Sequence, residues 1–405
     1  MHAPDTRRAR RAVTAALLAA LLILVPIALS ACGGGDSSSS SETSGETSEG
    51  GSTTAGGGGS SSSVVSAAEA AVEEAEEPKT EWKGPSKSPA PAKGKSVSVI
   101  GCSADVEGCV RDFDAAAEAA EEIGWNVTSL QTDGSPQGYN EAYKRAIDSK
   151  VDGILSAGIP SPLVEGPLKE AAADGIPVVS MAANNEPGEV GANFKGGLYA
   201  EVGPNQEEMG AMAGNYIVAE SGGEAIYGVL NDTTYPVLQV RIAGFESAIE
   251  KCESCDDKGE INVPVAEIAQ KLAPASLQFF RANPDLNYLF GSYDGGNVFA
   301  SQAVRQSGNS EIKIVGQDGS APNLDMIREG GPEVASAAYS LELIGWAAVD
   351  QLNRAFDGEA PAPEWMPENG GIQLRLIVQE NAPKSGPYVG DFEFEENFRE
   401  LWSIK

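Results

Sequence analysis

Apolar and polar residues alternate between two periods from residue 95 to residue 181. Four short, continuously apolar segments are typical of buried strands: 96–101, 125–130, 151–157 and 176–181. Longer segments with apolar residues at helical spacing lie between them, at 110–123, 138–149 and 162–173. Strands that alternate with helices of about 10–15 residues predict a parallel sheet covered by helices on both faces.

A second series with the same alternation follows. We expect strands at 225–230, 263–266, 286–291, 313–316, 334–339 and 372–378. We expect helices at 206–221, 237–251, 275–283, 297–307, 322–329 and 344–356. Residues 391–402 carry several aromatic side chains and are expected to form a docked tail. The predicted fold is therefore α/β, with two doubly wound parallel-sheet lobes.

The first 32 residues have the parts of an export signal. An apolar run of about 17 residues, Val13 to Leu29, follows four arginines. The next residues, Ser30-Ala31-Cys32, complete a match to the lipobox of bacterial lipoproteins. This resemblance implies that residues 1–31 are removed and that Cys32 is lipidated. The alternative is a transmembrane anchor, but the run contains Pro26 and is at the short limit of about 17–25 residues for a span.

The segment after Cys32 cannot form a core. Residues 32–63 are almost wholly Gly, Ser, Thr and Glu, which predicts a flexible tether with a mean span of about 30 Å. Residues 66–77 are strong helix formers, and prolines recur from 78 to 91. We therefore expect a short helix and a proline-rich connector within 64–95.

Charge and histidine content exclude several classes of function. The formal net charge is −31, and removal of residues 1–31, with four arginines and Asp5, makes it −34. Such a surface repels nucleic acid. The one histidine, His2, is lost with the signal, which excludes a Ser-His-Asp hydrolase and a zinc site built from histidines. We expect no metal ion and no cofactor.

Besides Cys32, four cysteines form two local pairs in the sequence. In an oxidising compartment, Cys102–Cys109 and Cys252–Cys255 are expected to be disulfides. A zinc site made from all four thiolates is an alternative, although the pairs fall in different expected lobes. A redox centre at Cys252 and Cys255 is another, but acidic neighbours disfavour a thiolate there.

Five motifs in order resemble the ribose- and galactose-type sugar-binding proteins, the type I substrate-binding components of ABC importers. They are Gly124-Trp125-Asn126, Val151-Asp152-Gly153-Ile154, Gly175-Ile176-Pro177-Val178-Val179, Arg241-Ile242-Ala243-Gly244-Phe245 and Ile314-Val315-Gly316-Gln317-Asp318-Gly319. The resemblance implies a first lobe of residues 96–204 with 341–374 and a second of 205–340 with 375–405. It also implies three crossovers, near 203–205, 339–342 and 374–377, and a ligand cleft between the lobes.

The resemblance also implies site residues in the second lobe. Arg241 matches an arginine that binds ligand hydroxyls, and Asp318 matches an aspartate that accepts hydrogen bonds from them. An ion pair for Arg241 and a helix cap for Asp318 are the alternatives. Tyr293 is a candidate for stacking on a sugar, or for packing only. The remaining candidates of this lobe are Asp294, Gln317, Ser340 and Asn205.

The first lobe departs from the family pattern. Gly108 and Cys109 stand where the family has stacking aromatic residues, and Ala182 and Ala183 replace an Asp-Arg pair. The polar candidates that remain there are Ser103, Asp105, Glu107, Asn184 and Asn185. A simple pentose therefore fits this lobe poorly, and we expect a small polar, sugar-like ligand.

Together these features predict a monomeric, lipid-anchored solute-binding protein on the outer face of the cytoplasmic membrane. It would capture its ligand by hinge closure and deliver it to an ABC permease. A sensing lipoprotein that signals to a membrane receptor is the first alternative. A secreted glycosidase with two carboxylates is another. A helix-turn-helix repressor and an ATPase are not supported, because the signal and tether occupy the place of a DNA-binding domain and no Walker motif is present.

Overall fold

The computed structural model describes residues 59–183 and 197–404. The expected signal, Cys32, most of the tether, Asn184 and Asn185 lie outside the described residues. Residues 55–405 belong to one unit, which contains both sheets. Within 59–183 and 197–404, no helix combines the length and the apolar composition of a membrane span.

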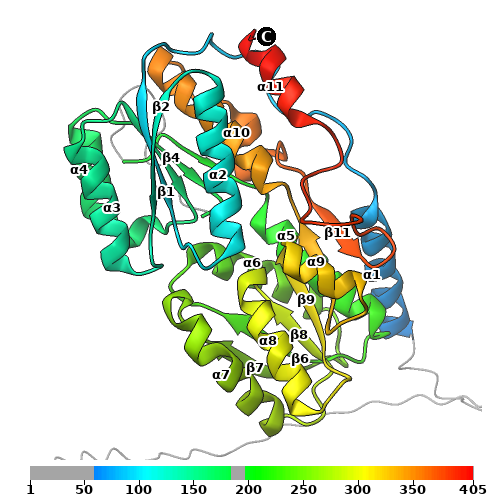
Figure 1. The fold of residues 1–405 in the computed structure, drawn as a ribbon. Helices are drawn as coiled ribbons and strands as arrows, with labels where there is room; N and C mark the ends of the chain where they lie inside the picture. The colour runs from blue at the N-terminus through cyan, green and yellow to red at the C-terminus, as the bar shows by residue number, and fades with distance from the viewer. Residues whose placement is uncertain (1–58, 184–196, 405) are drawn as a thin grey trace, which may run out of the picture. The chain divides into compact units, whose positions relative to one another are not determined.

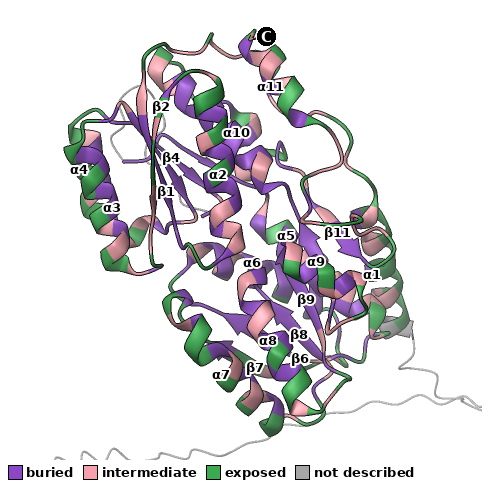
Figure 2. Cartoon of the chain, viewed as in Figure 1, coloured by how far each residue is buried: buried purple, intermediate pink, exposed green. Residues whose placement is uncertain are grey.

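Lobe 1 is built on a five-stranded parallel sheet in the order β2-β1-β3-β4-β5. Its strands are β1 (Ser96–Gly101), β2 (Asn126–Gln131), β3 (Gly153–Ala157), β4 (Val178–Met181) and β5 (Ala200–Val202). Its connecting helices are α2 (Glu107–Glu122), α3 (Pro136–Asp148) and α4 (Glu165–Ala173). Strands β1, β3 and β4 are buried almost throughout (Figure 2), as continuous apolar runs require.

Lobe 2 is built on a six-stranded sheet in the order β11-β10-β9-β8-β6-β7, in which only β11 is antiparallel to its neighbour. Its strands are β6 (Ile226–Asn231), β7 (Asp256–Asn262), β8 (Tyr288–Gly291), β9 (Lys313–Asp318), β10 (Glu333–Ala338) and β11 (Arg375–Val378). Its helices are α5 (Gln206–Glu220), α6 (Pro236–Ile249), α7 (Ile268–Ala282), α8 (Asp294–Ser307) and α9 (Ala321–Arg328). The predicted fold of two α/β lobes is confirmed (Figure 1).

The chain passes repeatedly between the lobes. It leaves lobe 1 after β5, through residues 203–205, and enters α5 of lobe 2. After β10 it returns to lobe 1 as α10 (Leu341–Asp357), which packs against α2. A third passage, before β11, brings it back to lobe 2. These passages lie close to the crossovers that the family resemblance implied.

The C-terminal helix corrects the expected division of the lobes. Helix α11 (Phe394–Trp402) was assigned to lobe 2 with residues 375–405, but it packs on lobe 1. Its apolar residues Phe394, Phe398 and Trp402 are four apart and form one face. The Trp402 ring stacks on Trp346 of α10 with a centroid distance of 5.6 Å.

The segment before β1 is also packed. Helix α1 (Gly59–Glu76) begins before the expected end of the tether and lies against α5 and β11 of lobe 2 (Figure 1). The connector that follows packs on lobe 1, where the Trp82 ring meets Trp365 and Phe398 edge-on at 5.3 and 5.2 Å. Residues 64–95 therefore contact both lobes.

The prediction of a strand at residues 263–266 was wrong. Residues 263–266 lead into a short 3₁₀ helix, Val265–Glu267, and the strand of this region is β7. Strand β7 has the sequence DDKGEIN and is mostly exposed because it forms the edge of the sheet. An edge strand needs little apolar surface, so its pattern is polar.

The four described cysteines form two local pairs. Cys102 and Cys109 have a Cα–Cα distance of 5.4 Å, as do Cys252 and Cys255, and both pairs are placed as disulfides. The first pair lies in lobe 1 and the second in lobe 2, which does not fit one zinc site made of all four thiolates.

Replacement of Trp402 by alanine tests the placement of α11. Trp402 is buried, and its Nε1 donates to Asp350 Oδ1 at 3.1 Å. We expect Trp402→Ala to lower the free energy of unfolding by about 3–5 kcal/mol, as for other large buried aromatic residues, in urea denaturation. Glu400→Ala, at an exposed position of the same helix, should change it by less than about 0.5 kcal/mol. Equal effects of the two substitutions would mean that α11 is not docked.

Candidate ligand-binding site

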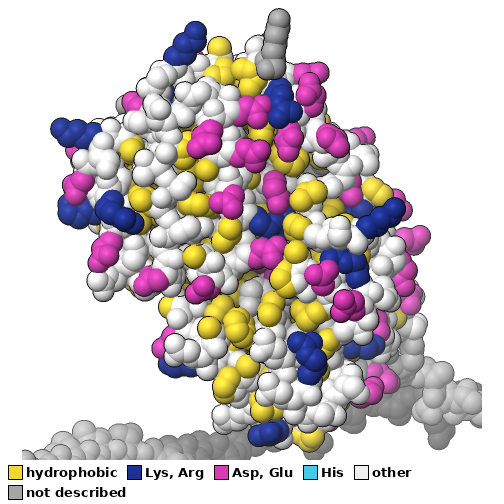
Figure 3. All heavy atoms as spheres, viewed as in Figure 1, with side chains coloured by type: hydrophobic (Ala, Val, Ile, Leu, Met, Phe, Trp, Pro, Cys, Tyr) yellow, Lys and Arg dark blue, Asp and Glu magenta, His cyan; other side chains and the backbone are white. Residues whose placement is uncertain are grey.

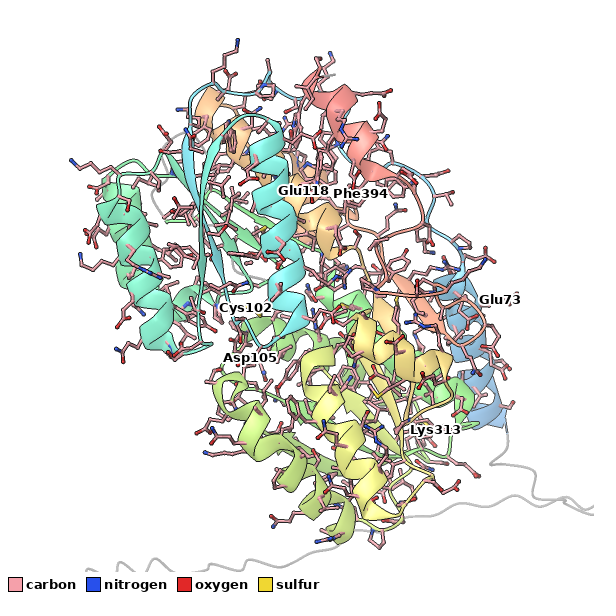
Figure 4. The ribbon with its side chains drawn as sticks, in the orientation of Figure 1. Glu73, Cys102, Asp105, Glu118, Lys313 and Phe394 are labelled. Carbon is pink, nitrogen blue, oxygen red and sulfur yellow. A yellow bond between two sulfur atoms is a disulfide. The ribbon has the colours of Figure 1, made fainter. Side chains whose placement is uncertain are left out.

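Strand ends from both lobes face one cavity of about 80 Å³. Lobe 1 contributes the residues after β1 and the first turns of α2. Lobe 2 contributes the residues after β8, β9 and β10 and the first two turns of α6. Figure 4 labels Cys102, which lines the cavity, at the end of lobe 1 that faces lobe 2. Ligands of doubly wound sheets bind beyond the carboxyl ends of the strands, which is where this cavity lies.

Arg241 lies in the second turn of α6 and is 3 % exposed. Its Nε donates to Gln206 Oε1 at 2.7 Å, and its Nη1 donates to the backbone oxygen of Ser292 at 2.9 Å. Its Nη2 lies 2.9 Å from Asp318 Oδ1. Burial lowers the pKa of Arg241, but the charge of Asp318, the Tyr339 hydroxyl and the hydrogen bonds to both together outweigh it, so the net shift is upward. With the Tyr339 hydroxyl, 3.2 Å from Nη2, Arg241 is a charged group held by four partners.

Glycines bring α6 close enough to α5 for these contacts. A Cβ atom at Gly210 of α5 would lie 1.8 Å from the backbone oxygen of Arg241. A Cβ atom at Gly244 of α6 would lie 1.9 Å from the backbone oxygen of Glu207. Only glycine permits this helix contact, which places Gln206 within reach of the guanidinium.

Asp318 ends β9 with a backbone φ of 94°, a conformation that costs a non-glycine residue about 1–3 kcal/mol. Its Oδ1 accepts from Arg241, and also from the Tyr339 hydroxyl at 3.2 Å. The same hydroxyl accepts from Arg241 Nη2 at 3.2 Å. The three side chains form a closed polar cluster at the floor of the cavity.

The wall from lobe 1 is apolar apart from one acid. The Cys102–Cys109 pair, Val106 and Leu341 line it, together with Asp112 of α2. Asp112 is 1 % exposed, and its Oδ1 accepts from the backbone N–H of Phe113 at 2.9 Å. Burial raises its pKa well above the ordinary value, although that N–H and the charge of Arg111 oppose the shift.

The structure brings together only some of the expected site residues. Arg241, Asp318 and Tyr293 line the cavity. Ser340 and Asn205 instead cap helices, accepting from the N–H groups of Leu343 and Glu208. Both lie at passages between the lobes, where a helix begins and needs a cap.

The other expected residues have structural contacts. In lobe 2, Gln317 Nε2 donates to the backbone oxygen of Met209 at 3.2 Å, behind the cavity wall. In lobe 1, Ser103 Oγ accepts from the backbone N–H of Asp105, and Asp105 is exposed. Glu107 Oε1 accepts from the Ala321 N–H at 2.9 Å. None of these four residues lines the cavity at Arg241, although Asp105 and Glu107 line a second pocket with residues of α8 and α9. Their contact with ligand stays a prediction.

Asp294 is part of a buried acid pair beneath the cavity. Its carboxylate accepts from the N–H groups of Gln317 and Ser320 at 3.1 and 2.7 Å, which joins the start of α8 to the end of β9. Burial and then the charge of Glu333 raise the pKa of Asp294. Burial raises the pKa of Glu333 to about 8, against hydrogen bonds from Asn323 and Asn297. Asp294 therefore positions the strand end that carries Asp318.

Sequence reasoning missed Asp112 and Tyr339 as cavity residues. Asp112 had a usable signal, because it lies three residues after Cys109 and four before Ala116 on the buried face of α2. Tyr339 had none, since it directly follows β10, where the sequence does not fix the direction of an aromatic side chain.

A family model described as the periplasmic binding protein domain matches residues 97–360. The chain belongs to this family. The ribose import binding protein of Escherichia coli is 23% identical over 278 residues, which cover 66% of this chain and 85% of that protein. The ribose import binding protein of Salmonella typhimurium is 22% identical over the same shares.

Solved structures of ABC transporter proteins have the same fold. An ABC sugar transporter subunit from Rhodobacter sphaeroides has a TM-score of 0.61 at 21% identity, over 71% of this chain and 98% of that one. An ABC transporter solute-binding protein from Agrobacterium vitis, solved with α-D-tagatopyranose, has a TM-score of 0.63 at 21% identity, over 72% and 96%. The family model and the shared fold agree with the periplasmic binding protein family that the ordered motifs indicated.

Glu333 provides a test of the buried acid pair by pH. Between pH 4.5 and about 8, the folded protein keeps a proton that the unfolded chain loses. The free energy of unfolding should therefore fall as pH rises through this range, by up to about 1.4 kcal/mol per pH unit for one proton. Glu333→Gln cannot ionise and should flatten the slope, measured by urea denaturation across pH. Glu329→Gln, at an exposed position, should keep the slope of the unmodified protein. An unchanged slope in Glu333→Gln would contradict the raised pKa.

Proposed function

We propose that this chain is the solute-binding component of an ABC importer, which captures a small ligand between its lobes and delivers it to a permease. The observation that carries the proposal is a cavity at the strand ends of both lobes, with the Arg241–Asp318 pair at its floor. A ligand there contacts both lobes and so stabilises the closed arrangement over an open one.

Contacts around the cavity support closure as the mechanism. Arg111 of α2 donates to the backbone oxygen of Tyr388 at 2.7 Å, across the cleft. The hydroxyls of Tyr139 in α3 and Tyr235 before α6 share a hydrogen bond of 2.5 Å. With the Glu107–Ala321 bond, these contacts close the rim on two sides. They are few and polar, so they can break when the lobes separate about the three passages.

We also propose where the protein acts and with which partners. Lipidation of Cys32 would hold the protein at the outer face of the cytoplasmic membrane, within reach of a permease. We propose that it acts there as a monomer. On the face in Figure 3, acidic and basic side chains are interspersed over both lobes, and the chain as a whole is strongly acidic. This charge disfavours nucleic acid as a partner.

We propose that the ligand leaves unchanged. Asp318 is committed to Arg241 and Tyr339, so it is not a free acid or base for glycoside cleavage. The related proteins are described as import or solute-binding proteins, one of them solved with glycerol. These descriptions make sugars and polyols the first compounds to test.

Ligand capture is tested by thermal shift on the mature protein with sugars, polyols, nucleosides and small amines. At least one compound should raise the melting temperature, because it binds the folded state alone. For that compound, Arg241→Ala should weaken binding by about 1.5–3 kcal/mol in calorimetry, the scale of a hydrogen bond to a charged group. Arg281→Ala, at an exposed position on α7, should bind as the unmodified protein does. A panel without any stabilising compound would contradict ligand capture.

A further inference from the structure

The cavity wall offers few polar groups to a ligand. Three of its residues are charged, three are tyrosines, and the other ten are Cys, Val, Leu, Ala or Gly. Within residues 59–183 and 197–404, no Ser, Thr, Asn or Gln lines it. A sugar carries a hydroxyl on nearly every carbon. Each hydroxyl that is buried on binding needs a hydrogen-bond partner, or its desolvation costs free energy. This wall suits a ligand with a mostly apolar body.

Most of the polar groups that are present already have partners. Arg241 and Asp318 neutralise one another, and the Tyr339 hydroxyl bonds to both. The Tyr235 hydroxyl is held by Tyr139. The Tyr293 hydroxyl is buried and has no hydrogen-bond partner among the described residues. Among the charged and tyrosine side chains that line the cavity, the carboxyl group of Asp112 is therefore the polar group left for a ligand.

Asp112 has no ion-pair partner among the described residues. Arg111, its neighbour in the sequence, points its guanidinium to Glu342 at 2.8 and 2.9 Å and to the backbone oxygens of Gly319 and Tyr388. No ion pair joins Asp112 to any described residue. Arg241 pairs with only one of the two aspartates of the wall, so ionisation of Asp112 would give the wall a net charge of −1. A buried carboxylate without an ion-pair partner is costly, and a cationic ligand group would remove that cost.

We propose that the cavity binds a small amine with an apolar body, and that Asp112 pairs with its ammonium group. The rings of Tyr235, Tyr293 and Tyr339 line the same space and provide faces that attract a cation. The volume of about 80 Å³ is smaller than the cavity of about 150 Å³ that holds benzene, so the apolar body is small. This inference rests on the proposed function and names the ligand class of the same site.

Matched amines and alcohols test the proposal on the mature protein. Propylamine, isobutylamine and cyclopentylamine, which are ammonium ions at pH 7, are each compared with the alcohol of the same carbon skeleton by calorimetry, with D-ribose as the polyol. We expect the best amine to bind at least tenfold more tightly than its alcohol. Asp112→Asn should reduce this ratio to within about twofold, because the amide carries no charge. Asp114→Asn, on the exposed side of α2, should leave the ratio unchanged.

The outcomes separate this inference from the proposed function. Equal binding of amine and alcohol would overturn the role of Asp112, as would an Asp112→Asn protein that keeps the full ratio. Binding of D-ribose or another sugar without any amine would overturn the amine class and leave solute capture standing. Failure of every compound in both panels would overturn both proposals. If Asp112→Asn does not fold, the amine-to-alcohol ratio of the unmodified protein decides alone.

Discussion

The buried pair of Arg241 and Asp318 is the interaction on which the site depends. Two charges removed from water are stable only when each remaining donor and acceptor finds a partner. Here the guanidinium reaches α5 through Gln206, the end of β8 through Ser292, and β9 and the residue after β10 through Asp318 and Tyr339. One side chain thus fixes the relative positions of three strand ends and two helices. These contacts offset the conformational free-energy cost of the positive φ of Asp318.

The alternation of strands and helices was enough to predict both sheets. It worked because central parallel strands are buried on both faces and must be apolar. It failed at β7, an edge strand whose sequence is mostly polar, and at β5, which is only Ala200–Val202 long. The aromatic pattern of α11 predicted docking but not the lobe. That choice depends on Trp346 and Trp365, which are far from it in the sequence.

The site could be predicted only in part, and the reason is physical. Arg241 and Asp318 were found through motifs that the family shares. Asp294 belongs to the same stretch of chain, yet its carboxylate turns away from the cavity to two backbone N–H groups. A sequence identifies the acid but not the direction of its side chain. Asp112 was missed for the converse reason: charged helix residues are usually solvated, and its burial follows from the packing of α2 against α10 and lobe 2.

The two lobes therefore contribute differently to recognition. Lobe 2 presents a polar cluster that is satisfied without a ligand, so it provides a rigid floor and little free hydrogen-bonding capacity. Among its described residues, lobe 1 presents an apolar wall and one acid without an ion-pair partner, beside a local cysteine pair in the β1–α2 segment. Discrimination between ligands comes from protein groups whose interaction free energy differs from one ligand to another. The Arg241–Asp318 pair already has its hydrogen bonds within the protein, so it contributes little to this difference. Discrimination between ligands should accordingly follow substitutions in α2 and the β1–α2 segment, while loss of Arg241 should weaken the binding of every ligand and lower the stability of lobe 2.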